Sequence, residues 1–194
     1  MQRLVSSSKS PKRGAFNQGV PEIIKNAKRL NWLISGCVLM EVKGGYTVEI
    51  DEFMAFCPYS EMYRSGKNEH ELKSRKSEKQ NRNDNVMEFM VLEVSLRSAV
   101  VSSKRAAKIR GLEKARKSLA SGEKIKGVVR NVMPYGAFID LGGVDGLLHI
   151  SELGDGWIDD IKKFIKNGQT MHVYVIGMDE ENKKISLSLK RNKQ

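Results

Sequence analysis

Three ring-bearing residues stand close together in the second half of the chain. Tyr135 precedes Gly136, Phe138 follows it, and His149 comes eleven residues after Phe138. Apolar residues alternate along 137–141, so Phe138 falls on the polar face of a strand, opposite the side chains that fill the core. A single phenylalanine in a strand usually belongs to the core, but this alternation favours an outward ring. Such a ring is available to stack on a flat ligand.

The elements that must position these rings are three short strands within residues 127–152. Val128, Val129 and Val132 are β-branched and favour a strand. Gly136 and the pair Gly142–Gly143 mark the two turns. The spacing from Phe138 to His149, less the second turn, predicts that the two rings lie side by side on neighbouring antiparallel strands.

The same pattern occurs earlier in the chain. A shift of 91 residues aligns the two copies without a gap over some 25 positions, and the aligned pairs are Gly36 with Gly127, Val38 with Val129, Gly45 with Gly136, Phe56 with Leu147, and Ser60–Glu61 with Ser151–Glu152. A repeat of this kind indicates two domains of one type in tandem. In the first copy the positions of the three rings hold Gly44, Thr47 and Pro58.

The segments YGAFIDLGGVDGLLHISE and GQTMHVYVIGMDEENKKISLSLK resemble the S1-type RNA-binding domain, a five-stranded OB-fold barrel. The resemblance implies a mainly β protein with two tandem OB-fold barrels joined by a basic α-helix. The expected boundaries are a flexible basic extension over 1–30, a first barrel over 31–103 with a basic loop at 64–83, a linker helix over 104–121, and a second barrel over 122–191.

The resemblance also implies an RNA-binding site on the second barrel. The family uses aromatic residues at the positions of Tyr135 and Phe138, a histidine at that of His149, and an arginine where this chain has Lys184. Lysine keeps the attraction for phosphate but lacks the planar, stacking guanidinium. Further phosphate contacts with weaker support are Lys126, Arg130, Lys190 and Arg191. We expect His172 and Tyr174 to be surface residues, and Asp179 to form a turn.

Charge points to the same class of ligand. The net charge of +11 predicts an anionic partner, nucleic acid first. The basic residues concentrate in the tail, the loop at 64–83 and the helix at 104–120, whereas residues 123–194 are close to neutral. In that helix Ile109, Leu112, Ala115 or Arg116, and Leu119 form the expected apolar stripe. Its basic face is either simply solvated or attracts phosphate. The acid-free first 21 residues fit a disordered tail or an organellar transit peptide.

Several function classes find no support in the sequence. No nucleophile–base pair, carboxylate cluster or phosphate loop appears, so we expect no enzyme activity and no cofactor. No pair of cysteines or histidines has metal-binding spacing, and Cys37 and Cys57 read as reduced thiols. No apolar run is long enough for a membrane span. In the second copy, helical spacing of Trp157, Ile158, Ile161, Phe164 and Ile165 predicts a plug at one end of the barrel.

The first copy, GGYTVEIDEFMAFCPYS, resembles the amino-terminal barrels of the ribosomal protein S1 family, which tether that protein to the ribosome. The expectation is a cytoplasmic, ribosome-associated protein whose first barrel docks to small-subunit proteins and rRNA and whose second captures single-stranded mRNA; an organellar compartment is also open. Two alternatives stay open: a free regulatory or RNA-decay adaptor built on the same domain, and a general nucleic-acid binder dominated by its helix and tail.

Overall fold

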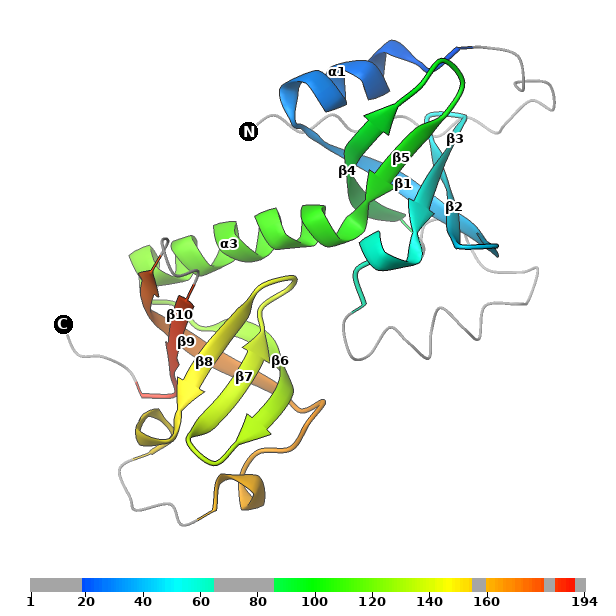
Figure 1. Cartoon of the computed structure of the whole chain (residues 1–194). Coiled ribbons are helices and arrows are strands. Elements are labelled where there is room, and N and C mark those ends of the chain that lie inside the picture. The colour runs from blue at the N-terminus through cyan, green and yellow to red at the C-terminus, as the bar shows by residue number, and fades with distance from the viewer. Residues whose placement is uncertain (1–18, 65–85, 155–159, 180–183, 191–194) are drawn as a thin grey trace. The chain divides into compact units, whose positions relative to one another are not determined.

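The computed structural model describes residues 19–64, 86–154, 160–179 and 184–190, which form two closed five-stranded barrels (Figure 1). This confirms the predicted fold class, including the helix that joins the barrels. That helix, α3 (Ser103–Ser121), contains the boundary between two compact units, which falls between Ala107 and Lys108. The predicted flexible tail up to residue 18, nearly all of the basic loop and Arg191 lie outside the described residues.

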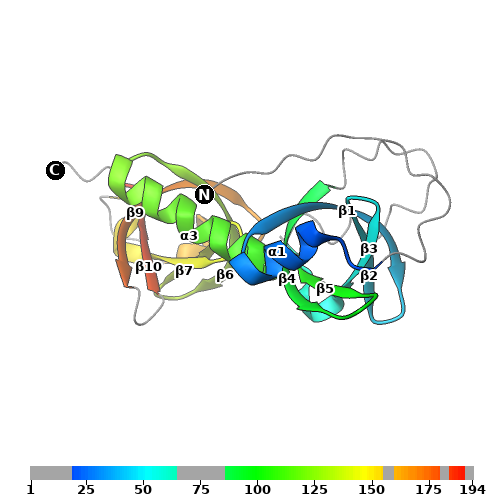
Figure 2. The same cartoon turned by 90° about the horizontal axis from the view of Figure 1, so that it is seen from above.

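The first barrel has the strand order β1-β2-β3-β5-β4. Its elements are α1 (Glu22–Leu30), β1 (Leu33–Val42), β2 (Gly45–Ile50), β3 (Phe53–Pro58), the 3-10 turn η1 (Tyr59–Glu61), β4 (Val86–Val94) and β5 (Ala99–Ser102). The expected flexible extension over 1–30 is wrong for its last part, because helix α1 follows Pro21 and buries Ile24 and Ala27 in the core of the first barrel. It packs against β4, as Figure 2 shows, and so closes one side of the core.

The second barrel repeats this order with β6 (Ile125–Met133), β7 (Gly136–Asp140), β8 (Asp145–His149), η3 (Ile150–Glu152), η4 (Ile161–Lys163), β9 (Thr170–Asp179) and β10 (Lys184–Ser188). Strand pairing shifts between Val38 and Met40 in the first barrel, and between Val129 and Asn131 in the second. These bulges are 91 residues apart, which is the period of the sequence repeat. The residue that each bulge adds, Leu39 or Arg130, is therefore in an equivalent place.

Helix α3 contacts the second barrel through part of the predicted stripe, because Ala115 belongs to the barrel core and Leu112 packs against it. Gly111, Ala115 and Ser118 are buried, whereas Leu119 is 41% exposed. The small residues let the helix approach closely: a Cβ on Gly111 would lie 2.8 Å from Cγ2 of Val144 and 3.0 Å from the carbonyl oxygen of Gly142. The expectation that Leu119 belongs to the buried stripe was wrong, because close backbone packing, not side-chain size, sets the contact face.

Replacing Gly111 with alanine is expected to lower the stability of the second barrel. In an isolated helix the change would stabilise by about 1 kcal/mol, but here the new methyl group meets the backbone of the β7–β8 turn. Thermal unfolding should show a lower melting temperature, while Lys117→Ala, on an exposed position of the same helix, should leave it nearly unchanged. A higher melting temperature for Gly111→Ala would contradict the close packing.

The end of α3 is also fixed by one hydroxyl group. Ser118 is buried, and its Oγ donates to the carbonyl oxygen of Glu123 at 2.6 Å and accepts from the amide of Val175 at 3.4 Å. Gly122 follows with φ +66°, a left-handed conformation that suits glycine at a helix end. The helix terminus is thereby held to β9.

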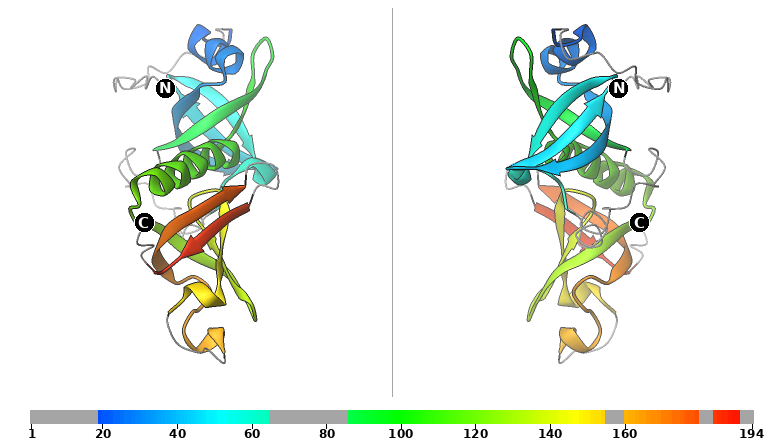
Figure 3. Two further views of the ribbon diagram at one scale, coloured as in Figure 1. Left: turned by 90° about the vertical axis from the view of Figure 1, so that its left-hand side faces the viewer. Right: turned by 90° about the vertical axis from the view of Figure 1, so that its right-hand side faces the viewer.

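The structure describes part of the predicted plug after β8. Residues 155–159, including Trp157 and Ile158, lie outside the described residues. Ile161 and Ile165 are buried, as predicted, but Phe164 is 62% exposed. The segment makes one 3-10 turn, not the regular helix that the spacing suggested, and the prediction that Phe164 packs inward was wrong. Figure 3 shows η4 at the end of the second barrel away from α3.

Both cysteines are free thiols, and one is deeply buried. Cys57 lies in the core of the first barrel. Burial raises the pKa of its thiol to about 11, with a smaller upward contribution from Glu61 and an opposing hydrogen bond from the backbone of Ser103. Cys57 therefore stays protonated at neutral pH and acts as an apolar core residue.

Candidate nucleic-acid interface

The outer surface of the second barrel carries a row of paired side chains centred on Phe138. Phe138 on β7 pairs with Asn131 on β6 and with Leu147 on β8, and Leu147 pairs in turn with Ser186 on β10. Residues directly opposite each other in a sheet share a face. Because Ala137 and Ile139 are fully buried while Phe138 is partly exposed, Phe138 faces outward, as the alternation predicted.

The other two predicted rings lie beside this row. His149 on β8 pairs with Gly136, one step along the face from Phe138, and is exposed. Tyr135, in the turn before β7, is 45% exposed. Its carbonyl oxygen accepts a hydrogen bond of 2.9 Å from the amide of Ile150, which ties the Tyr135 turn to the end of β8. The three rings are thus gathered at one end of one face.

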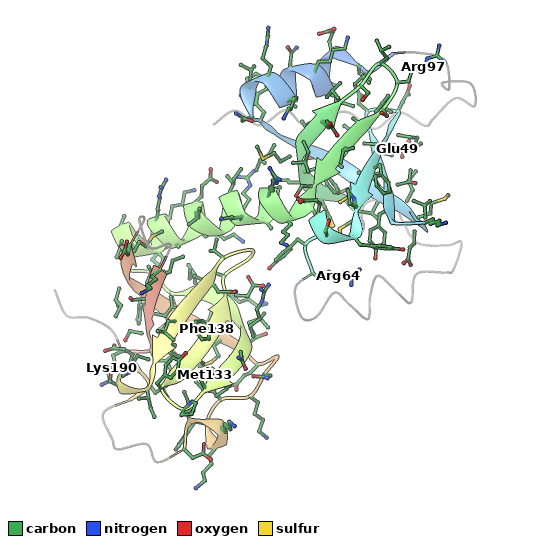
Figure 4. All side chains as sticks on the ribbon, viewed as in Figure 1. Glu49, Arg64, Arg97, Met133, Phe138 and Lys190 are labelled. Atoms are coloured by element: carbon green, nitrogen blue, oxygen red, sulfur yellow. The ribbon has the colours of Figure 1, made fainter. Side chains whose placement is uncertain are left out.

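Gly136 makes this arrangement possible. A Cβ on Gly136 would lie 2.5 Å from the carbonyl oxygen of Leu148 and 3.1 Å from Cα of His149. Any side chain here would push β7 away from β8 and separate the rings. Met133 on β6 pairs with Gly136 and places an apolar side chain beside it. Figure 4 labels Met133 and Phe138 on the wall formed by β6, β7 and β8.

The histidine ring has a fixed orientation. Nδ1 of His149 accepts from the amide of Ser151 at 3.3 Å and lies 2.9 Å from the Ser151 hydroxyl. A ring nitrogen that accepts from an amide carries no proton, so the other nitrogen, Nε2, carries it in the neutral ring. His149 therefore offers a flat ring with an N–H donor at its far edge.

A charged cluster borders the same face. Nη2 of Arg130 lies 3.3 Å from Oδ2 of Asp140, and its Nη1 lies 3.4 Å from Oδ2 of Asp145. Asp140 is only 4% exposed, and its Oδ1 accepts from the amides of Gly142 and Gly143 at 2.9 and 2.8 Å. Asp140 thus shapes the β7–β8 turn and holds Arg130 at once.

The two carboxylates change what Arg130 can do. Burial raises the pKa of Asp145, Arg130 opposes that rise, and the neighbouring Asp140 adds to it. The guanidinium is half exposed and shared between two acids, so much of its charge is already balanced. The sequence predicts a phosphate contact for Arg130. Its position next to the Phe138 row suits a guanidinium that stacks on a base at least as well.

The remaining predicted cations are spread around the barrel. Lys184 is exposed at the start of β10, two residues before Ser186, and so lies next to Asp145 on the same face. Lys190 follows β10, where its amide donates to Oγ of Ser188. Lys126 is exposed but pairs with His172 on β9, away from the rings. The structure brings Lys184 to the candidate site and leaves Lys126 at a distance.

The equivalent face of the first barrel carries different side chains. Comparing the two copies only at the three ring positions did not reveal the aromatic ring that this face does carry. Met40, Thr47 and Phe56 form the row that corresponds to Asn131, Phe138 and Leu147. The aromatic ring is thus present but moved to the next strand, where Phe56 lies over Gly45, with ring atoms 2.8 Å from the position of a Cβ. The 91-residue repeat already implied the cross-strand register, and this register would have shown that Phe56 belongs to the row.

Apolar side chains dominate this first-barrel face. Leu39, Met40 and Met54 are 38%, 60% and 41% exposed, and β1, β2 and β3 contain no lysine or arginine. Tyr59 beside them donates its hydroxyl to Glu41 at 2.7 Å. On this face, which we call the methionine face (Leu39, Met40, Met54 and Phe56), the strands supply no cation for phosphate, and the exposed Lys43 lies in the β1–β2 turn.

Two other kinds of site are absent from the described part of the chain. Among these residues, no group of three or more histidine, cysteine or acidic side chains is placed to hold a metal ion. Within the same ranges, no helix combines the length and apolar character that crossing a bilayer requires.

Comparison with known proteins identifies the type of barrel. Residues 118–190 match the family model of the S1 RNA-binding domain, so fold and site together define a protein of tandem S1-type OB barrels. The small ribosomal subunit protein bS1 of Coxiella burnetii is 32% identical over 177 residues, which are 87% of this chain and 30% of that protein. The bS1 protein of Neisseria meningitidis is 34% identical over 191 residues, which are 95% and 32%.

The chain is similar to these bS1 proteins over most of its own length, and it spans about a third of the length of these relatives. Among solved structures, it is similar to a chain in the complex of a/eIF2alpha, aDim2p and rRNA from Pyrococcus horikoshii. The identity is 33%, the TM-score is 0.34, and the match covers 37% of this chain and 45% of that one.

Proposed function

We propose that this chain binds single-stranded RNA, mRNA in particular, through the outer face of its second barrel while associated with the small ribosomal subunit. The observation that carries the proposal is the grouping of Tyr135, Phe138 and His149 at one end of a sheet face that is otherwise accessible. Unpaired bases stack on such rings with little dependence on sequence. Lys184, one step along the face from the row of Phe138 on the side away from His149, supplies a cation for the backbone. The role is binding without catalysis.

The first barrel has a separate role in this proposal. The strands of its methionine face contain no lysine or arginine, and the face holds one ring, Phe56, where the second barrel gathers three, so it is better suited to protein than to RNA. Exposed methionine and leucine side chains adapt to the shape of a protein partner. We assign this barrel to docking on a protein of the small subunit, in the cytoplasm where translation takes place.

Co-sedimentation with small ribosomal subunits after nuclease digestion of mRNA tests the proposal. The intact chain should remain bound, and the double change Met40→Lys with Met54→Lys should release it. Leu96→Lys is the matched control, because Leu96 is 91% exposed in the β4–β5 turn of the same barrel, and it should stay bound. Release of the intact chain on digestion would favour a free RNA-binding adaptor.

A further inference from the structure

A groove runs between α3 and the edge of the second barrel, within the second compact unit. Its volume is about 590 Å³. The helix contributes one wall, and the β7–β8 turn, the end of β9 and the start of β10 contribute the other. Its charged lining residues are the cations Lys108, Arg116 and Lys184 and the acids Asp145 and Asp179, and Leu112 and Met178 are among its apolar ones.

The groove combines cations with an apolar floor. Lys108, Leu112 and Arg116 are four residues apart along α3 and share one face of the helix. Lys184, at the start of β10, lines the groove from the barrel side, and Leu112 and Met178 add apolar side chains to the lining. Positive groups around an apolar surface match a nucleotide, whose phosphates are anionic and whose base is flat and largely apolar on its faces.

The groove is continuous with the proposed RNA-binding face. Asp145 and Lys184 line the groove, and they also lie one step from the row of Phe138, Leu147 and Ser186. Asp145 is held by Arg130 through Oδ2. A strand that stacks on Phe138 and passes over Leu147 therefore reaches the groove without crossing any other element.

We propose that this groove holds a further unpaired nucleotide of the bound RNA strand, with its phosphates on Lys108, Arg116 and Lys184 and its base against Leu112 and Met178. The proposal rests on the proposed function and extends it. RNA binding then involves the linker helix directly, and the binding site is longer than the barrel face alone. Short oligonucleotides occupy only the face, and longer ones also fill the groove.

The test uses the full chain and unstructured, labelled oligonucleotides of 4 and 12 nucleotides, with binding measured by fluorescence anisotropy. Lys108→Glu with Arg116→Glu should weaken binding of the 12-mer about tenfold or more. Binding of the 4-mer should change by less than about twofold. The slope of log affinity against log salt for the 12-mer should become shallower by about 0.7 for each phosphate that the variant no longer neutralises.

The matched control is Lys114→Glu with Lys117→Glu, which makes the same charge change on the same helix at positions that do not line the groove. If both pairs of substitutions weaken binding of the 12-mer equally, the proposed nucleotide site in the groove is wrong, because the loss of affinity would then reflect net charge alone. Glutamate keeps the helix propensity of these exposed positions, and unchanged thermal unfolding verifies the fold. Phe138→Ala separates the two proposals: if it weakens both oligonucleotides while the groove variant weakens neither, only the groove is wrong.

Discussion

Replacing Phe138 with alanine is expected to weaken binding of an unstructured RNA by about tenfold to a hundredfold. A stacked base contributes roughly 1–3 kcal/mol, and about 1.4 kcal/mol corresponds to a factor of ten in affinity. Because Phe138 faces outward and is only partly buried, its removal costs little core packing. Titration of a labelled oligonucleotide measures the affinity, and circular dichroism with thermal unfolding measures the fold.

The chain supplies a matched control for this substitution. Phe164 is 62% exposed and belongs to the same unit, but it follows η4 and is not part of the strands β6, β7 and β8 that carry the row of Phe138. Phe164→Ala removes the same ring and should leave affinity within about twofold. RNA affinity that is unaffected by Phe138→Ala in a folded protein would rule out the stacking site.

Replacing Gly136 with alanine adds one methyl group, and we expect it to destabilise the second barrel more than a methyl group added anywhere else on the binding face. The added Cβ would lie 2.5 Å from the carbonyl oxygen of Leu148, and backbone on both strands must move to accept it. Overpacking of this kind costs about 1–3 kcal/mol, which lowers the melting temperature of a domain of this size by about 10 °C. RNA affinity should fall as well, since Tyr135 and His149 are held on either side of this contact.

Gly154 offers the comparison for this effect. A Cβ there meets nothing within 4 Å, so Gly154→Ala should leave both the melting temperature and RNA binding essentially unchanged. Calorimetry of the two variants side by side measures the difference. A melting temperature for Gly136→Ala equal to that of Gly154→Ala would show that β7 and β8 are not so closely paired.

The barrels and the rings could be predicted from the sequence because both leave local marks. Alternation along 137–141 placed Phe138 on the outer face, and glycine positions marked the turns that bring it next to His149. The 91-residue repeat indicated the second domain without any further assumption. These features depend on neighbours in sequence or on a fixed period, so pattern alone was sufficient.

What the sequence did not reveal depends on contacts between distant segments. Arg130 reads as a free cation until the bulge and the β7–β8 turn bring Asp140 and Asp145 to it. Leu119 fits an apolar stripe until Gly111 is seen to set the buried face of α3. Phe56 is noticed only once the register places it in the row of Thr47. In each case the deciding contact joins two different strands, or a helix and a sheet.

The two barrels carry a bulge at equivalent places and display different residues there, Leu39 and Arg130. Each bulge is a backbone feature, set by strand pairing and not by the residue that it displays. The displayed residue can therefore be leucine in one barrel and arginine in the other while the strands on either side of the bulge keep their pairing. Exchanging Leu39 and Arg130 should accordingly alter the surface chemistry of both barrels and leave their strand pairing unchanged.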